Sequence, residues 1–269
     1  MMDTKEILDS LLQQLSELEE VRAAGISGGL DVPNAGEGDI DVFLYCDRIP
    51  EPKVREVILQ HAGSGATEAK VSVFTGGNWG TGDFIRINGV ETWLMYFTIN
   101  ETLTNVEEIL AGKYPDREGY YYPVGRLAML KKIHIIFDKI DFLNGIKRRL
   151  NEYPKELAEE LASYHLEQLK DTEDFERAVA RRDVLFYHVT LDNALDHFLQ
   201  ALFAMNKTFF PSRKRNFEHM KKFQIKPERC EDKILEIIRL GSTSDGIERS
   251  YRLLNDLIRK LMEFRISQP

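Results

Sequence analysis

The chain has 269 residues, of which 43% are hydrophobic and 30% are charged, and its formal net charge is −8 at pH 7. These values are typical of a folded globular protein and exclude an intrinsically disordered chain. The net negative charge disfavours a large nucleic-acid interface, which needs a basic face. With only two cysteines, the sequence predicts neither a disulfide framework nor a cysteine cluster for zinc.

The first residues, MMDTKEILDSLL, are acidic and amphipathic and lack the basic start and apolar centre of a signal peptide. No stretch approaches the roughly 18 uninterrupted apolar residues that a membrane span needs. We therefore expect a cytoplasmic protein without a membrane partner.

The first part of the chain is predicted to mix helices and strands. Asp3 is placed to cap a helix whose leucines recur at helical spacing, and Glu6 is placed to complete a capping box. A glycine turn follows at Ser27-Gly28-Gly29, and after it a strand over 40–45 and a helix over 52–61.

Further along, the pattern predicts strands over 70–75, 83–87 and 90–98, with a glycine-rich loop over 76–82. The dipeptide Asn88-Gly89 between two apolar runs is a strong hairpin signal. A short strand over 133–137, followed by Asp138, ends this region.

After about residue 141 strand signals stop and helical periodicity continues over 154–170, 173–205, 228–240 and 246–266. The sequence therefore predicts an α+β protein with a mixed sheet and flanking helices over 1–141. An all-α helical bundle is predicted to follow over 142–269.

Two aspartates carry the strongest chemical signal. Asp39 and Asp41 flank Ile40 at the start of a strand, so both carboxylates project from one face while Ile40 points to the core. Carboxylates side by side repel unless a cation lies between them, and a divalent metal ion is the usual solution. Together with the preceding glycines, which let the backbone approach a phosphate, the pair predicts Mg²⁺-dependent phosphate chemistry.

A third carboxylate is expected for a nucleotidyl transfer, and Glu91 is the candidate. It stands at the start of a strand that is otherwise apolar and aromatic, where burial without a partner is costly. Such a carboxylate either binds a second metal ion or takes the proton from the attacking hydroxyl. The alternative is an exposed residue at the mouth of the hairpin.

The run Ser27-Gly28-Gly29, the spacer from Leu30 to Gly38, and Asp39-Ile40-Asp41 resemble the signature of the polymerase-beta-type nucleotidyltransferase superfamily. The layout of the chain is similar to the small-molecule members, such as the kanamycin, streptomycin and lincosamide nucleotidyltransferases. The resemblance implies that Asp39 and Asp41 bind Mg²⁺, that Glu91 is the base, and that Ser27, Gly28 and Gly29 contact the nucleotide. ATP or another nucleoside triphosphate would be the donor and a small-molecule hydroxyl the acceptor.

In the helical half, Lys207 and Arg213 belong to a basic segment that either contacts the triphosphate or forms a solvated turn after a helix. Asp192 and Asp196 share a helix face, as an acidic wall for a cationic substrate or, more commonly, as polar residues on an outer face. None of the six histidines has metal-ligand spacing with another.

The sequence thus predicts a nucleotidyltransferase that moves AMP from ATP onto a hydroxyl of a small molecule, with antibiotics among the candidates. Two alternatives remain open. One is modification of a protein or of an RNA end, for which the net negative charge makes RNA the weaker choice. The other is a non-catalytic nucleotide-binding relative. The acceptor and the oligomeric state stay open.

Overall fold

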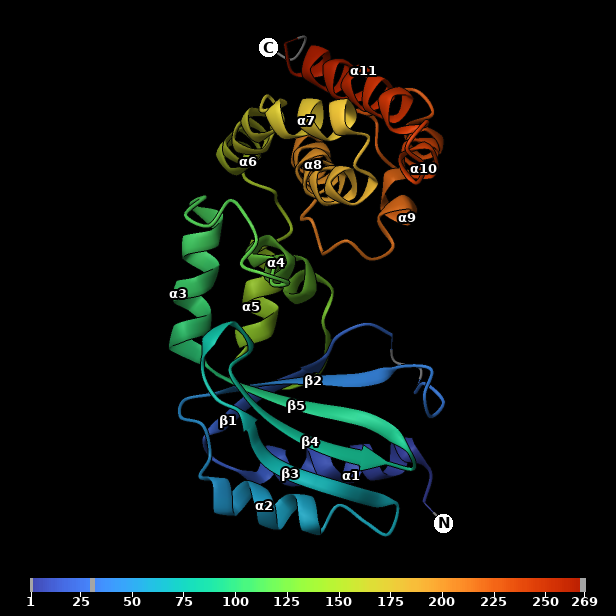
Figure 1. The fold of residues 1–269 in the computed structure, drawn as a ribbon. Helices are drawn as coiled ribbons and strands as arrows, with labels where there is room; N and C mark the ends of the chain where they lie inside the picture. The colour runs from blue at the N-terminus through green and yellow to red at the C-terminus, as the bar shows by residue number, and fades with distance from the viewer. Residues whose placement is uncertain (1, 30–31, 267–269) are drawn as a thin grey trace. The chain divides into compact units, whose positions relative to one another are not determined.

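The computed structural model describes residues 2–29 and 32–266 and divides into two compact units (Figure 1). Unit 1 comprises Met1–Glu107 and Met129–Glu152, and unit 2 comprises Glu108–Ala128 and Tyr153–Pro269. This division departs from the predicted single boundary near residue 141, because 108–128 group with the helical unit and 142–152 with the sheet. α3 (Ile99–Leu110) and α4 (Pro123–Lys132) each contribute residues to both units.

Within the described residues, unit 1 forms a six-stranded mixed sheet in the order β3-β4-β5-β2-β1-β6. The strands are β1 (Val21–Ile26), β2 (Asp39–Cys46), β3 (Ala66–Phe74), β4 (Thr81–Ile87), β5 (Val90–Thr98) and β6 (His134–Asp138). The predicted hairpin is confirmed as β4 and β5, which pair antiparallel around Asn88 and Gly89. β1 was not predicted, because its short run of small residues gives little periodic signal.

One face of the sheet is covered by α1 (Thr4–Glu17) and α2 (Pro52–Gln60), which lie on the same side of it (Figure 1). The predicted capping box is confirmed: the Glu6 N–H donates to the Asp3 carboxylate and the Asp3 N–H donates to the Glu6 carboxylate, each at 2.8 Å. Alternate residues of β2 enter this core, among them Ile40 and Val42. Their burial against α1 fixes the direction in which the intervening aspartates point.

The other face of the sheet is aromatic toward the end of β2. The Phe43 ring stacks on Phe97 with centroids 6.1 Å apart, and the Tyr45 ring lies 5.2 Å from Phe142 at the start of α5 (Phe142–Arg149). These contacts explain why α5 belongs to unit 1 although it follows the predicted boundary. A short 3₁₀ helix, η1 (Gly77–Trp79), occupies the predicted glycine-rich loop.

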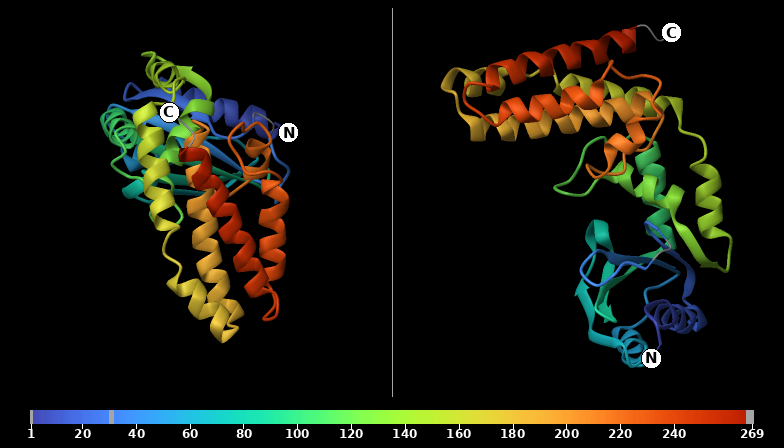
Figure 2. Two further views of the ribbon diagram at one scale, coloured as in Figure 1. Left: turned by 90° about the horizontal axis from the view of Figure 1, so that it is seen from above. Right: turned by 90° about the vertical axis from the view of Figure 1, so that its right-hand side faces the viewer.

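Unit 2 is helical, and its central element α8 (Val184–Met205) packs against four other helices. The helices of this part are α6 (Lys155–Gln168), α7 (Glu173–Arg181), α8, α9 (Asn216–Met220), α10 (Cys230–Gly241) and α11 (Ile247–Ile266). Helices α8, α10 and α11 run alongside one another (Figure 2). In the part of the chain that the structure describes, no helix is long and apolar enough to cross a membrane.

The single helix predicted over 173–205 is two helices. Arg182 adopts a left-handed conformation with φ of 53°, which ends α7. The Asp183 carboxylate then accepts the Phe186 N–H at 3.0 Å and caps α8. Hydrophobic periodicity does not register such a break, because only one backbone residue leaves the helical region.

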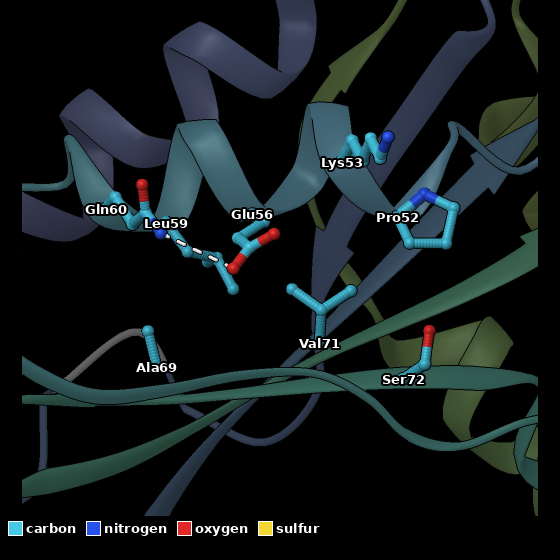
Figure 3. A pocket seen from close by; sticks show the side chains of 8 residues that line it. All are labelled: Pro52, Lys53, Glu56, Leu59, Gln60, Ala69, Val71 and Ser72. Carbon is cyan, nitrogen blue, oxygen red and sulfur yellow. Dashed lines mark hydrogen bonds between the residues drawn. The ribbon is translucent and has the colours of Figure 1, made fainter.

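A hollow of about 460 Å³ lies between α2 and β3 in unit 1 (Figure 3). Its lining combines apolar and polar side chains: Pro52, Lys53, Glu56, Leu59, Gln60, Ala69, Val71 and Ser72. The predicted carboxylates of the β2 and β5 strands do not belong to this lining.

A buried ion pair lies beside this hollow. Arg55 is 2% exposed and pairs with the Asp83 carboxylate, which is fully buried. The guanidinium also donates to the Pro50 carbonyl at 2.9 Å, and the Ser72 N–H donates to Asp83 at 2.8 Å. Burial raises the pKa of the Asp83 carboxyl, while the Ser72 amide and Arg55 act in the opposite direction.

We predict that Asp83→Asn lowers the free energy of unfolding by about 3–5 kcal/mol, because it leaves the Arg55 charge buried without its partner. Urea unfolding measures the change. Asp47→Asn is the control, since Asp47 pairs with Arg22 at the surface and its loss should cost less than about 1 kcal/mol. Equal losses in the two variants would contradict the prediction.

Candidate functional site

The register of two parallel strands brings the three predicted carboxylates together. β2 and β5 pair in parallel with Asp39 opposite Glu91 and Asp41 opposite Trp93. Because residues in register project to the same side of a sheet, Asp39, Asp41 and Glu91 share one face. Ile40 points the other way into the core and is 5% exposed.

The glycine turn begins beside Asp41. Ser27 directly follows β1, and its N–H donates to the Asp41 carbonyl oxygen at 3.1 Å. Gly28 has a φ of +85°, with open space where a Cβ would lie, so its conformation rather than crowding favours glycine. Leu30 and Asp31 of the predicted spacer lie outside the described residues.

Glu91 is exposed, so the argument from the cost of burying a carboxylate does not apply to it. Its side chain keeps 49% of its surface accessible at the mouth of the β4–β5 hairpin and accepts a hydrogen bond from Arg86 Nη2 at 3.1 Å. Arg86 also pairs with Glu68 at 3.2 Å. The register places Glu91 opposite Asp39, one residue after the buried Val90 that begins β5. Its role as a base stays a prediction.

Sequence reasoning did not identify the aromatic surface that adjoins the acids. Trp93, which stands opposite Asp41, lies with its ring 4.9 Å from Phe84 and 5.8 Å from Phe74. Alternation along β4 and β5 was a usable signal, since these residues fall on the same face as Glu91. The face that carries the carboxylates therefore continues into a cluster of three aromatic rings, in which Trp93 is half-buried and Phe84 is buried.

The donor set of this face suits Mg²⁺. The ion prefers hard oxygen ligands and is usually held by one or two carboxylates with water and phosphate oxygens completing the shell. Asp39 is exposed and Asp41 is half-buried, so both belong to an accessible face. We therefore name Asp39 and Asp41 as the residues that would hold the ion.

Lys207 and Arg213, the predicted triphosphate contacts, belong to unit 2. Lys207 is exposed just after α8 with a φ of 49°. Arg213 is held by two carboxylates: its Nε donates to Asp196 at 2.7 Å and its Nη1 to Asp192. Nucleotide binding by either residue stays a prediction.

Asp196 is neither part of an acidic wall nor a polar residue on an outer face, because its side chain is fully buried. It accepts hydrogen bonds from the Tyr122 hydroxyl at 2.6 Å and from Gln200 Nε2 at 3.0 Å. The Nε atom of Arg117 also lies 3.3 Å from an Asp196 carboxylate oxygen and forms an ion pair with it. Helical spacing cannot reveal this burial, since three of the partners, Arg117, Tyr122 and Arg213, come from outside α8.

Comparisons with known proteins give limited matches. A family model described as a domain of unknown function (DUF4037) matches residues 121–215. Among solved structures, the chain is similar to a nucleotidyltransferase-like protein from Exiguobacterium sibiricum 255-15, with a TM-score of 0.49 and 11% identity. That alignment covers 92% of this chain and 71% of the other. A search of curated proteins found no match.

We predict that Gly28→Ala lowers the free energy of unfolding by about 1 kcal/mol, because alanine is strained at positive φ. Gly145→Ala is the matched control, since Gly145 lies within α5 and a Cβ there meets only Arg148 Nη2 at 3.8 Å. That change should stabilise the helix by about 0.5–1 kcal/mol. Thermal and urea unfolding measure both, and shifts of the same sign would contradict this account.

Proposed function

We propose that the chain is a Mg²⁺-dependent nucleotidyltransferase that transfers a nucleoside monophosphate, AMP from ATP in the first instance, to a hydroxyl of a small molecule. The observation that supports it is the register of β2 and β5, which aligns Asp39, Asp41 and Glu91 on one face of the sheet. The glycine turn that adjoins Asp41 is the second support. The resemblance of Ser27–Asp41 to a nucleotidyltransferase signature agrees with both.

Asp39 and Asp41 bind the metal in this proposal. When bound, Mg²⁺ would neutralise charge on the triphosphate and make the α-phosphorus more electrophilic. Their shared face matters because both carboxylates must reach one ion, which residues on opposite faces of a strand cannot do. The Ser27-Gly28-Gly29 turn lies against the phosphates, where the absence of a Cβ on the glycines lets backbone N–H groups approach oxygen atoms.

Glu91 accepts the proton of the acceptor hydroxyl at a carboxylate oxygen. The hydroxyl oxygen forms a bond to the α-phosphorus, the bond from that phosphorus to the bridging oxygen breaks, and pyrophosphate leaves. Arg86 holds the Glu91 carboxylate in position through the 3.1 Å contact. The half-buried indole of Trp93 offers a surface on which a base or an apolar acceptor ring can stack.

We expect Asp39→Asn and Asp41→Asn each to lower the rate of pyrophosphate release from ATP and Mg²⁺ by at least about 100-fold, since one charged metal ligand is lost. A coupled phosphate assay with a panel of hydroxyl acceptors measures the rate. Asp47→Asn, which alters an exposed carboxylate just after β2, should keep full activity.

Three results would separate the readings. If Asp39→Asn and Asp41→Asn lose pyrophosphate release while Asp47→Asn keeps it, the result supports the proposed nucleotidyltransferase activity. If the chain binds ATP and Mg²⁺ in a way that needs Asp41 but turns over no acceptor, it is a non-catalytic nucleotide-binding protein and the proposed activity is wrong. Transfer to protein or RNA but not to small hydroxyl compounds overturns the choice of acceptor.

Glu91→Gln tests the base separately from the metal ligands. We expect kcat to fall by about 100-fold or more while KM for ATP stays within about twofold, because the change removes proton acceptance but not nucleotide binding. Glu68→Gln is the matched control, as it removes the other carboxylate that pairs with Arg86. Equal effects of the two substitutions would show that Glu91 acts only as a partner of Arg86.

A further inference from the structure

Three side chains with metal-binding atoms meet inside unit 2, away from the predicted active site. His165 lies on α6, His197 on α8, and Asp116 in the segment between α3 and α4. One ligand atom from each lies within 4.8 Å of the others. The two Nδ1 atoms of His165 and His197 face each other at 2.9 Å.

The distances suit a shared ion. Two imidazole nitrogens that bind one zinc ion at about 2.0–2.1 Å are about 3.3–3.4 Å apart at the tetrahedral angle, so the two rings would separate by about 0.5 Å to bind a common metal. The ligand oxygen of Asp116 lies within 4.8 Å of a nitrogen of each ring, so the carboxylate would move inward to join them. A hydrogen bond between the two rings is the competing explanation, and it requires a proton on one of the two Nδ1 atoms.

Both imidazole rings are buried. His165 is 1% exposed and His197 is 6% exposed. Burial lowers the pKa of His165 to about 4, and it also lowers that of His197 below its ordinary value. A metal ion binds the neutral imidazole, which is the form that burial favours.

The third ligand is positioned by hydrogen bonds. The Arg117 N–H donates to one Asp116 carboxylate oxygen at 2.7 Å, and the Tyr164 hydroxyl donates to the other at 3.4 Å. The Arg117 guanidinium also pairs with Asp196, the residue that precedes His197 on α8. This ion pair links the segment that carries Asp116 to the helix that carries His197.

We propose that Asp116, His165 and His197 form a binding site for one divalent transition-metal ion, with Zn²⁺ as the ion that the donor set favours. Two imidazoles and one carboxylate are a common zinc ligand set. Mg²⁺ prefers oxygen ligands, so this site and the Asp39–Asp41 face select different ions. The ion would join the 108–128 segment to α6 and α8 and so stabilise unit 2.

The test uses the full chain stripped of metal with a chelator and titrated with Zn²⁺ by calorimetry. We expect one equivalent to bind, excess Mg²⁺ not to displace it, and the melting temperature to rise on binding. Co²⁺ in place of Zn²⁺ should give visible absorption bands from nitrogen and oxygen coordination. The Asp41→Asn variant should retain the same zinc stoichiometry, which separates this site from the carboxylate face.

Asp116→Asn and His197→Gln should weaken zinc binding by at least about 100-fold and abolish the Co²⁺ bands, as removal of a ligand exceeds the effect of losing an outer-shell partner. His188→Gln is the matched control, because His188 lies on α8 outside the cluster and should bind as the native chain does. If His197→Gln fails to fold, Asp116→Asn decides, since Asp116 is only half-buried. Absence of zinc binding in the native chain, or native affinity in Asp116→Asn, overturns the proposal.

Discussion

The parallel pairing of β2 with β5 is the constraint on which unit 1 depends. Among the described strands it is the only parallel pair, and it sets the starts of two strands side by side, Asp39 against Glu91. A slip of one residue would turn Ile40 away from α1 and place the aspartates in the core. Exposing the apolar side chains and burying the carboxylates would both cost free energy, so this register is strongly favoured. Core packing on one face therefore fixes the chemistry presented on the other.

Each unit also contains a buried carboxylate whose negative charge is balanced by arginine. In unit 1, Asp83 meets Arg55, and in unit 2, Asp196 meets Arg117 and Arg213. Buried charges of this kind contribute little net stability but tolerate no loss of a partner, so they specify one arrangement of their elements. In unit 2 the arrangement is that of the 108–128 segment against α8, which accounts for its grouping with the helices rather than with the sheet.

The two proposed metal sites differ in donor chemistry for a structural reason. The first stands at the exposed start of β2, where accessible carboxylates would suit Mg²⁺ bound to a triphosphate. The second is enclosed by helices, where the two buried imidazoles of His165 and His197 bring nitrogen atoms within 2.9 Å of each other and suit a softer ion. Burial thus decides which ion each site prefers.

The sequence by itself determined the local features: the Asp3 capping box, the Asn88-Gly89 hairpin, the α+β order of elements, and the two aspartates on one side of β2. Each depends on residues within a few positions of one another, where spacing translates directly into geometry. Only the tertiary structure decided that β1 is a strand, that Glu91 is exposed beside Arg86, that Asp196 is buried, and that His165 meets His197. Those outcomes rest on partners far apart in the chain, which no local pattern encodes.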